Sequence, residues 1–214
     1  MIRQLIFDMD GTLADTGKAT IPALARVSAQ YGLSRVPDQI ILDTIGFANP
    51  EFYFRLYPAL PKEFMVTFGS EVEAVEEKMI RALGKKILFP GIDDLLQSLK
   101  SLNITLHVAS TGDSNHIHAV LEASGINAYF SSVCCGEPEK AGMIAKITGN
   151  HPRETFAMVG DRAYDLRAAR QNFIWAIAAA YGYCSDADAA NFDFVLRSPD
   201  ELICLLQDIQ RQPS

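Results

Sequence analysis

Short apolar segments alternate with amphipathic helical patterns over the second half of the sequence, and this alternation constrains the fold more than any other feature. The strand-like runs span residues 104–109, 130–135, 156–159, 173–178 and, more weakly, 194–196. Helical spacing of apolar residues lies between them, as at Ile117, Val120 and Leu121. Strands that alternate with helices predict a parallel sheet covered on both faces. The predicted fold class is therefore α/β, with a doubly wound parallel sheet.

A further apolar strand is predicted at residues 2–7, far from the others in the sequence. The intervening stretch carries helical patterns and is punctuated by prolines, up to Pro90-Gly91. The first strand can be buried only in the same sheet, so the helical stretch is an insertion. We predict an α/β core domain made of residues 1–13 and 89–214, and an α-helical cap domain made of residues 14–88.

Length and composition limit the classes of function. A chain of 214 residues with 49% apolar content can bury roughly 70% of its unfolded surface, which is enough for a full core. The 26 acidic and 19 basic residues give a net charge of -7, and no block rich in lysine or arginine occurs. This charge repels polyanions, so we expect no nucleic-acid partner.

The apolar runs are too short for membrane insertion. Asp8 interrupts the first run before it reaches the length of a signal-peptide core, and residues 173–181 are about half as long as a membrane span. The four cysteines show neither CxxC nor Cys/His ligand spacing, which indicates reduced thiols. We therefore expect a soluble, cytoplasmic protein without a membrane partner.

Polar residues follow the carboxyl ends of the predicted strands, where open α/β sheets bind their ligands. These residues are Asp8, Asp10, Ser110, Thr111, Lys140, Asp161 and Asp165. Each alone has a simple structural explanation as a helix cap, a turn residue or a surface charge. Together they bring several carboxylates to one edge of one sheet, where they repel each other strongly unless a cation lies among them.

The same residues carry a family resemblance. The sequence resembles the haloacid dehalogenase superfamily of phosphohydrolases in four ordered motifs: Asp8-Met9-Asp10-Gly11-Thr12, Ser110, Lys140 and Gly160-Asp161-Arg162-Ala163-Tyr164-Asp165. It is most similar to phosphoglycolate phosphatase-like members, and the helical insertion lies where that family carries a small cap. One departure is Ala141, where the family commonly has proline after the lysine. Lys146 is the competing lysine, but we expect Lys140 to precede the helix and to face the strand ends.

The resemblance implies a catalytic role for four of these side chains. Asp8 is the expected nucleophile, which forms an aspartyl phosphate. Asp10 is the expected general acid and base, which protonates the leaving oxygen and then takes a proton from water. Ser110 donates a hydrogen bond to a phosphoryl oxygen, and Lys140 offsets the charge of the nucleophile and the phosphate.

The resemblance also implies a magnesium ion and a phosphate-binding loop. Mg²⁺ prefers oxygen ligands, and the expected ones are Asp8, Asp161 and the backbone carbonyl of Asp10. The remaining substrate-binding residues are expected to be Gly11, Thr12 and Thr111, with Ser110 and Lys140. Asp165 has three possible roles: to hold a metal-bound water, to orient Lys140, or only to begin a helix.

The cap is expected to close over the site and to set the specificity. The predicted partner is a small-molecule phosphate ester, first phosphoglycolate and then sugar phosphates, and the predicted assembly is a monomer or homodimer. We considered Asp15, Thr16, Lys18, Gly46, Phe47 and Arg55 for substrate contacts, but a surface charge or a helix break explains each equally well. The four histidines have no metal-ligand spacing and are assigned no role.

The predicted activity is that of a phosphoric monoester hydrolase, and other functions compete with it. A phosphomutase of the β-phosphoglucomutase type uses the same nucleophile and differs only in cap residues. A catalytically silent binding protein on the same fold has no need of intact Asp8, Asp10, Lys140 and Asp161. A phospho-receiver has no use for Asp10 or a cap, and a dehalogenase that attacks carbon has no leaving alkoxide for Asp10 to protonate.

Overall fold

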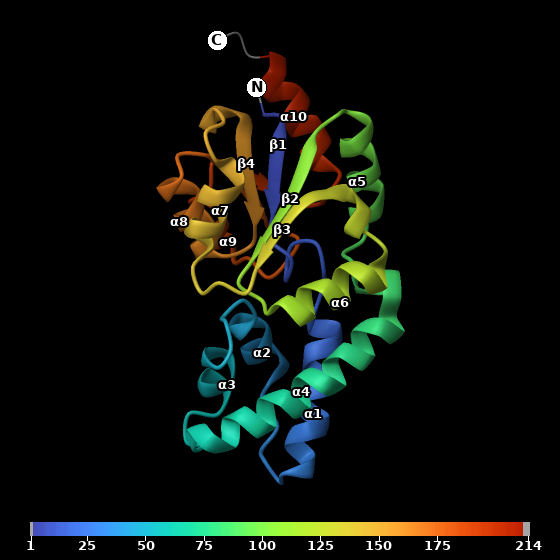
Figure 1. Ribbon diagram of the computed structural model, residues 1–214, viewed down its shortest axis with the longest axis vertical. Helices are drawn as coiled ribbons and strands as arrows, with labels where there is room; N and C mark the ends of the chain where they lie inside the picture. Colours follow the sequence, from blue (N-terminus) through green and yellow to red (C-terminus); the bar gives the residue numbers. More distant parts are fainter. Residues whose placement is uncertain (1, 212–214) are drawn as a thin grey trace.

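The computed structural model describes residues 2–211, apart from the side chain of Gln210. Within them a single parallel sheet has the strand order β3-β2-β1-β4-β5-β6. The strands are β1 (Gln4–Phe7), β2 (Thr105–Ser110), β3 (Phe130–Cys135), β4 (Phe156–Gly160), β5 (Trp175–Ala179) and β6 (Phe194–Leu196). This architecture confirms the predicted α/β fold class (Figure 1).

Helices fall into an inserted group and a group that flanks the sheet. The inserted helices are α1 (Gly17–Gln30), α2 (Asp38–Thr44), α3 (Glu51–Leu56), α4 (Lys62–Leu83) and the 3-10 turn η1 (Gly84–Ile87). The flanking helices are α5 (Ile92–Ser101), α6 (Ser114–Ser124), η2 (Asn127–Tyr129), α7 (Lys140–Thr148), η3 (Arg153–Thr155), α8 (Ala163–Gln171), α9 (Asp186–Ala189) and α10 (Glu201–Arg211). No helix within residues 2–211 combines the length and hydropathy that crossing a bilayer requires.

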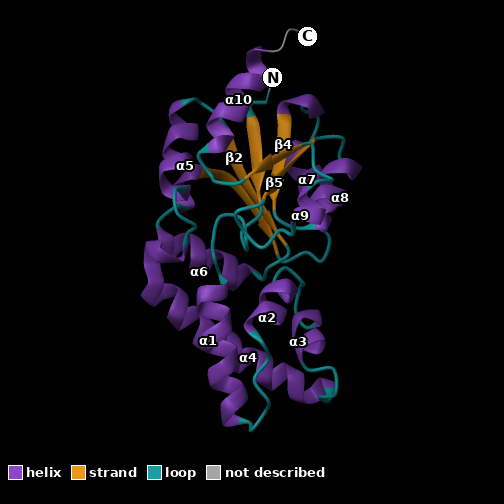
Figure 2. Ribbon diagram, turned by 180° about the vertical axis from the view of Figure 1, so that it is seen from behind, coloured by secondary structure: helices purple, strands orange, loops and turns teal. Residues whose placement is uncertain are grey.

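Both faces of the sheet are buried, as the continuous apolar strands require. One face packs against α5, α6 and α10, with Leu5, Phe7 and Val108 fully buried in its core. The other face packs against α7, α8 and α9, and its core contains Ile6 and Met158. Figure 2 shows the sheet between these two layers.

The register of the central strand aligns the site. Phe7 in β1 pairs with Val108 of β2 on one side and with Val159 of β4 on the other. The three central strands therefore end at nearly the same level. The polar residues that follow Phe7 and Val159 consequently emerge side by side, at the edge nearest the inserted helices (Figure 1).

The inserted helices have a core of their own. Residues such as Leu24, Phe52, Phe68 and Val72 are buried together between α1, α3 and α4. An isolated bridge between Ala14 and Leu88 joins the two connections to the sheet. The predicted cap boundaries, residues 14 and 88, coincide with this bridge. Met1 and residues 212–214 of the predicted core lie outside the described residues.

Two local expectations about the core are wrong. The strand predicted at residues 173–178 begins only at Trp175, because Phe173 has a left-handed backbone (φ 56°) and its side chain is 83% exposed. Phe173 therefore belongs to the turn after α8. Lys140 does not precede its helix but is the first residue of α7. Its side chain nevertheless reaches the strand ends, because a first-turn side chain points back toward the helix start.

Candidate active site

Asp8 lies at the carboxyl end of β1 and is almost fully buried. Its backbone amide donates a hydrogen bond to the carbonyl oxygen of Val159, at 2.9 Å, which continues the sheet pairing by one residue. Its Oδ1 accepts hydrogen bonds from the Met9 amide and from Lys140 Nζ, both at 2.8 Å. Burial raises the pKa of Asp8 well above its ordinary value, Lys140 lowers it, and the neighbouring carboxylates raise it further.

Lys140 joins two carboxylates that are far apart in the sequence. Its ammonium contacts Asp8 and donates a hydrogen bond to Asp165 Oδ1, and all three side chains are buried. Burial lowers the pKa of Lys140, but the charges of Asp165 and Asp8 raise it overall above its ordinary value. A buried ammonium paired in this way stays charged, and it can offset negative charge beside Asp8.

Asp165 has two structural tasks. Its Oδ1 accepts from Lys140, and its Oδ2 accepts from the backbone amide of Arg162, at 2.9 Å, which caps the start of α8. These two contacts fit two of the roles considered for Asp165, which are to orient Lys140 and to begin a helix. A side chain at Gly160 would collide with Asp165, since its Cβ would lie 2.6 Å from the Asp165 Cβ. Glycine at this strand end therefore lets the Asp165 side chain lie against the backbone of β4.

Asp161 follows β4 and is fully buried. Its Oδ1 accepts a hydrogen bond from Thr12 Oγ1, at 3.1 Å. Within residues 2–211 its Oδ2 accepts no hydrogen bond, and it forms an ion pair with Arg162 Nε at 3.3 Å. Burial and the charge of Asp165 raise the pKa of Asp161 to about 7, against the lowering effects of Arg162, Lys140 and Thr12.

The three buried carboxylates fit a divalent cation. Oxygen atoms of Asp8, Asp161 and Asp165 lie within 4.8 Å of one another. An unpartnered buried carboxylate oxygen costs free energy, and a hard cation satisfies it directly. Gly11 keeps the approach open, since a Cβ at this position (φ 79°) would collide with Asp161 Oδ2 and lie 2.7 Å from the Tyr183 ring. The residues present therefore fit a magnesium ion.

Asp10 contacts His116 of α6. Asp10 Oδ1 lies 2.8 Å from His116 Nε2. Burial alone would raise the pKa of Asp10, but the charge and hydrogen bond of His116 lower it overall. Burial also lowers the pKa of His116, whereas Asp10 and the nearby Glu76 and Asp113 raise it to about 10. The two side chains therefore form a partly buried ion pair, with Asp10 buried and the His116 side chain 20% exposed.

The hydroxyls after β2 have different partners. Ser110 Oγ is buried and accepts a hydrogen bond from the Gly112 amide, at 3.1 Å, which leaves its own proton available. Thr111 Oγ1 donates instead to the carbonyl oxygen of Gly46, at 2.8 Å, in the inserted helices. Thr111 therefore connects the insertion to the core, whereas Ser110 is the hydroxyl free to donate.

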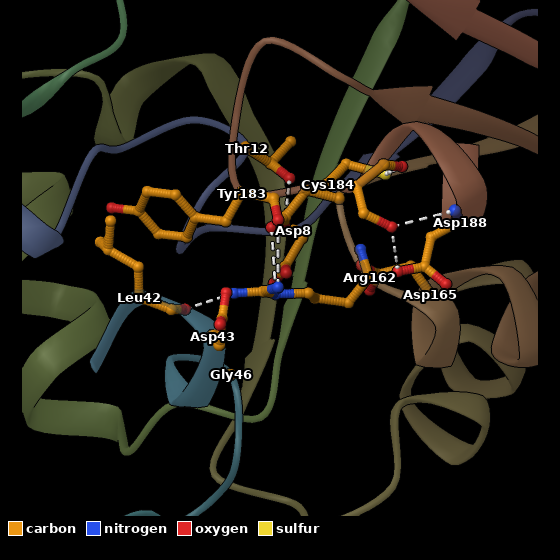
Figure 3. Close-up of polar contacts among 12 residues, drawn as sticks. Asp8, Thr12, Leu42, Asp43, Gly46, Arg162, Asp165, Tyr183, Cys184 and Asp188 are labelled. Carbon is orange, nitrogen blue, oxygen red and sulfur yellow. Dashed lines mark hydrogen bonds and ion pairs between the residues drawn. The ribbon is translucent and has the colours of Figure 1, made fainter. Parts of the chain in front are cut away.

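Arg162 is a second connection between the two parts. Figure 3 shows its side chain extending from the loop after β4 to the carbonyl oxygen of Leu42, with which it forms a hydrogen bond. It also donates to the carbonyl oxygen of Tyr183, at 3.1 Å. Tyr183 in turn accepts from the Gly17 amide at the start of α1, at 2.8 Å. These contacts hold the insertion over the strand ends.

A pocket of about 290 Å³ lies between the insertion and the core, beside Asp10. The core side is formed by Asp10, Gly112, Asp113, Asn115 and His116. The insertion contributes Thr16, Thr20, Ile45, Gly46, Phe47, Ala48, Asn49, Phe52, Tyr53, Ser70, Glu73, Ala74, Glu76, Glu77 and Ile80. The pocket can hold a small molecule whose reacting end lies at Asp10.

The structure gathers most of the residues named from the sequence, but not in one cluster. Asp8, Lys140, Asp161, Asp165 and Thr12 form connected contacts. Asp10 lines the pocket. Of the unassigned candidates in the insertion, Thr16, Gly46 and Phe47 line the pocket, and Asp15, Lys18 and Arg55 do not.

His116 was not found by sequence reasoning. It has no metal-ligand spacing, and its contact with Asp10 depends on how α6 follows β2. The only local signal was its place in the first turn of the helix that follows the strand ending at Ser110. Glu73 and Glu76 were also missed, because acidic residues on a long helix resemble a solvent-exposed face.

Comparison with known proteins gives a consistent family. A family described as "Haloacid dehalogenase-like hydrolase" matches residues 5–179. A phosphoglycolate phosphatase from Synechococcus elongatus is 27% identical over 220 residues, which cover 99% of this chain and 100% of that protein. A pyrophosphatase, PpaX, from Oceanobacillus iheyensis is 24% identical, with 97% and 98% covered. A haloacid dehalogenase-like hydrolase structure from Streptococcus pneumoniae superposes with a TM-score of 0.83 at 23% identity, with 96% and 98% covered.

Proposed function

The chain belongs to the haloacid dehalogenase-like hydrolases and is a phosphoric monoester hydrolase, and from that premise we propose a magnesium-dependent reaction through an aspartyl phosphate on Asp8. The observation that carries this proposal is the buried Asp8 carboxylate held by Lys140 beside Asp161. An anionic nucleophile can approach a phosphate dianion only where cations offset the charge. Lys140 is one such cation.

In the first step the free Oδ2 of Asp8 attacks phosphorus, and the bond from phosphorus to the leaving oxygen breaks. Both described contacts of Asp8 use Oδ1, which supports this assignment. Asp10 passes to the leaving oxygen a proton that it takes from Nε2 of protonated His116, 2.8 Å from its Oδ1, so that an alcohol departs. Ser110 donates a hydrogen bond to a phosphoryl oxygen, and Lys140 offsets the charge of the phosphoryl group. The backbone amides of Gly11 and Thr12, expected from the sequence to bind phosphate, donate instead to the carbonyl oxygens of Ala14 and Met9.

In the second step water attacks phosphorus and gives its proton to Asp10. The bond from phosphorus to Asp8 breaks, which releases inorganic phosphate and restores both carboxyl groups. Lys140 stays charged throughout and offsets charge on the carboxylate and the phosphoryl group. Asp165 keeps Lys140 in place.

We assign magnesium to the carboxylates of Asp8 and Asp161 and the backbone carbonyl of Asp10. The buried Oδ2 of Asp161, which accepts no hydrogen bond from residues 2–211, supports this assignment. When bound, the ion neutralises charge on the phosphoryl oxygens and fixes their orientation. Asp165 lies close enough to serve as a further ligand or to orient a bound water.

Release of phosphate from p-nitrophenyl phosphate and a panel of small esters, with and without Mg²⁺, tests the proposal. Phosphoglycolate belongs in the panel because of the relatives' names, and sugar phosphates because they are the second substrate class expected from the sequence. We expect metal-dependent turnover that is lost in Asp8→Asn, while this variant stays folded. Turnover that survives in Asp8→Asn contradicts the assignment of the nucleophile. Inactivity of the folded wild-type protein on every ester contradicts the phosphatase reaction.

A further inference from the structure

The pocket beside Asp10 determines which leaving group the site accepts. Asp10 is the residue that we propose as proton donor to the leaving oxygen, so the rest of the departing alcohol must lie in this pocket. The inference below therefore rests on the proposed function and concerns the part of the substrate that carries no phosphate. The charge of the pocket wall is the decisive property.

The wall is acidic. Its ionisable side chains are Asp10, Tyr53, Glu73, Glu76, Glu77, Asp113 and His116. Within residues 2–211, neither lysine nor arginine contributes to the wall. His116 is the sole cationic side chain there, and its charge is paired with Asp10 at 2.8 Å.

Of two nearby arginines, one neutralises a single carboxylate of the wall, Glu77. Arg81 pairs with Glu77, one turn away on α4, at 2.8 Å. Arg55 pairs with Glu51 on α3, also at 2.8 Å, and its guanidinium lies 3.8 Å from the centre of the Phe47 ring. Because Phe47 lines the pocket and Arg55 does not, the aromatic ring separates this arginine from the interior.

Of two carboxylates on α4, Glu73 has no ion-pair partner within residues 2–211, and Glu76 has His116, which it shares with Asp10. Glu73 accepts a hydrogen bond from the Asn49 amide, at 2.7 Å, and Glu76 accepts one from Thr20. Neither partner carries a charge, and the His116 ring lies 3.9 Å from Glu76. Burial raises the pKa of Glu73, as do the charges of Asp113 and Glu76, so these groups repel one another. A positive charge placed between them would relieve this repulsion.

The other walls suit a short carbon skeleton. Phe47, Phe52, Tyr53 and Ile80 form apolar surface, and the volume of about 290 Å³ restricts the occupant to a small molecule. Thr16 also lines the pocket, and its buried hydroxyl has no partner within hydrogen-bonding geometry. A polar substituent on the leaving group could satisfy this hydroxyl.

We propose that the preferred substrates are phosphate monoesters of small amino alcohols, whose ammonium group lies between Glu73 and Glu76. A leaving group that carries a carboxylate, as glycolate does, meets like charges in the same place and is disfavoured. The charge of the wall therefore reverses the order expected from the sequence, in which phosphoglycolate comes first.

A series of three esters of nearly equal size tests this order. The esters are 2-aminoethyl phosphate, 2-hydroxyethyl phosphate and phosphoglycolate, whose two-carbon leaving groups carry an ammonium, a hydroxyl or a carboxylate. We expect kcat/KM at neutral pH to fall in that order, by about tenfold at each step, as the charge on the leaving group changes. p-Nitrophenyl phosphate with Mg²⁺ serves as the activity reference.

Charge reversal in the pocket gives a second test. Glu73→Lys is expected to lower kcat/KM for 2-aminoethyl phosphate and to raise it for phosphoglycolate, each by about tenfold. Glu71→Gln is the control, because Glu71 lies on the same helix outside the pocket and bonds to Tyr31. This control is expected to leave the order and the rates unchanged.

The outcomes separate this inference from the proposed function. If p-nitrophenyl phosphate is hydrolysed but 2-aminoethyl phosphate is not the best of the three esters, the inference is wrong and the phosphatase activity stands. If Glu73→Lys leaves the order unchanged, the site of the ammonium is wrong. If no ester at all is hydrolysed, the proposed function and the inference both fall.

Discussion

His116 Nε2 lies 2.8 Å from Asp10 Oδ1, which joins the first turn of α6 to the loop that follows β1. This partly buried pair lines the pocket beside the proposed reaction centre. The contact fixes the direction of the Asp10 carboxylate. The His116 ring also lies 3.9 Å from Glu76, so its positive charge offsets the repulsion between the carboxylates of Asp10 and Glu76.

The pair makes stability depend on pH in a defined direction. The folded-state pKa of His116, about 10, exceeds its ordinary value of 6.5. Its protonated form therefore stabilises the fold fully below pH 6.5, and this contribution is lost as the pH rises through about 10. We expect His116→Gln to lower the free energy of unfolding by about 3 kcal/mol near pH 6.5, and by much less above pH 10. Urea denaturation in EDTA measures both values.

His118→Gln is the matched control for that experiment. His118 lies two residues further on α6, and its ring contacts Ser114 at the helix surface. We expect the free energy of unfolding of this variant to stay within about 0.5 kcal/mol of the wild type at both pH values. An equal loss of stability in His116→Gln at both pH values contradicts the ion pair.

Metal binding should be measurable without any substrate. Burial raises the pKa of Asp161 to about 7 in the folded protein. Ionisation of this carboxyl is therefore less favourable in the folded than in the unfolded chain, which lowers the stability of the metal-free fold at neutral pH. Mg²⁺ at a hundredfold excess over its dissociation constant should raise the free energy of unfolding by about 2.7 kcal/mol. We expect Asp161→Asn to lose this response while remaining at least as stable as the wild type in EDTA. The exposed Asp208→Asn should keep the full response. A wild-type protein that does not respond to Mg²⁺ contradicts the site.

Gly46 should be essential for the position of the loop that carries Phe47. A Cβ at Gly46 (φ 105°) would collide with the Tyr164 hydroxyl, and its carbonyl oxygen accepts from Thr111. We expect Gly46→Ala to displace this loop and to lower kcat/KM for p-nitrophenyl phosphate by about tenfold or more, as misplaced contacts do.

Gly32→Ala separates that effect from backbone strain. Gly32 also has a left-handed backbone (φ 65°) in the insertion, but a Cβ there meets no atom within 4 Å. We expect a loss of about 1 kcal/mol in stability and an unchanged kcat/KM. Equal kinetic effects of the two alanine substitutions would show that the contact with Tyr164 has no bearing on activity.

Asp10→Asn tests the acid and base role directly. Asparagine keeps the size of the side chain but can neither give nor take the proton, so we expect kcat to fall by about 100-fold or more. With p-nitrophenyl phosphate, whose leaving group needs little protonation, the phosphorylated protein should accumulate. Intact-protein mass spectrometry after rapid quenching detects it. Wild-type kcat in this variant contradicts the role of Asp10.

The sequence determined the sheet and the polar residues at its edge. Alternating strands and helices require a parallel sheet, and parallel strands place their carboxyl ends together whatever their order. Asp8 and Asp161 could therefore be predicted as neighbours although 152 residues lie between them in the chain. The common direction of the parallel strands is sufficient for this inference.

The tertiary structure alone decided the pocket and its charge. His116 meets Asp10, and Glu73 and Glu76 face the same space, only because α4 and α6 pack at particular rotations about their axes. A helical repeat shows which residues share a face but not which neighbour that face meets. Contacts between distant elements depend on the packing of whole surfaces, and no short stretch of sequence encodes it.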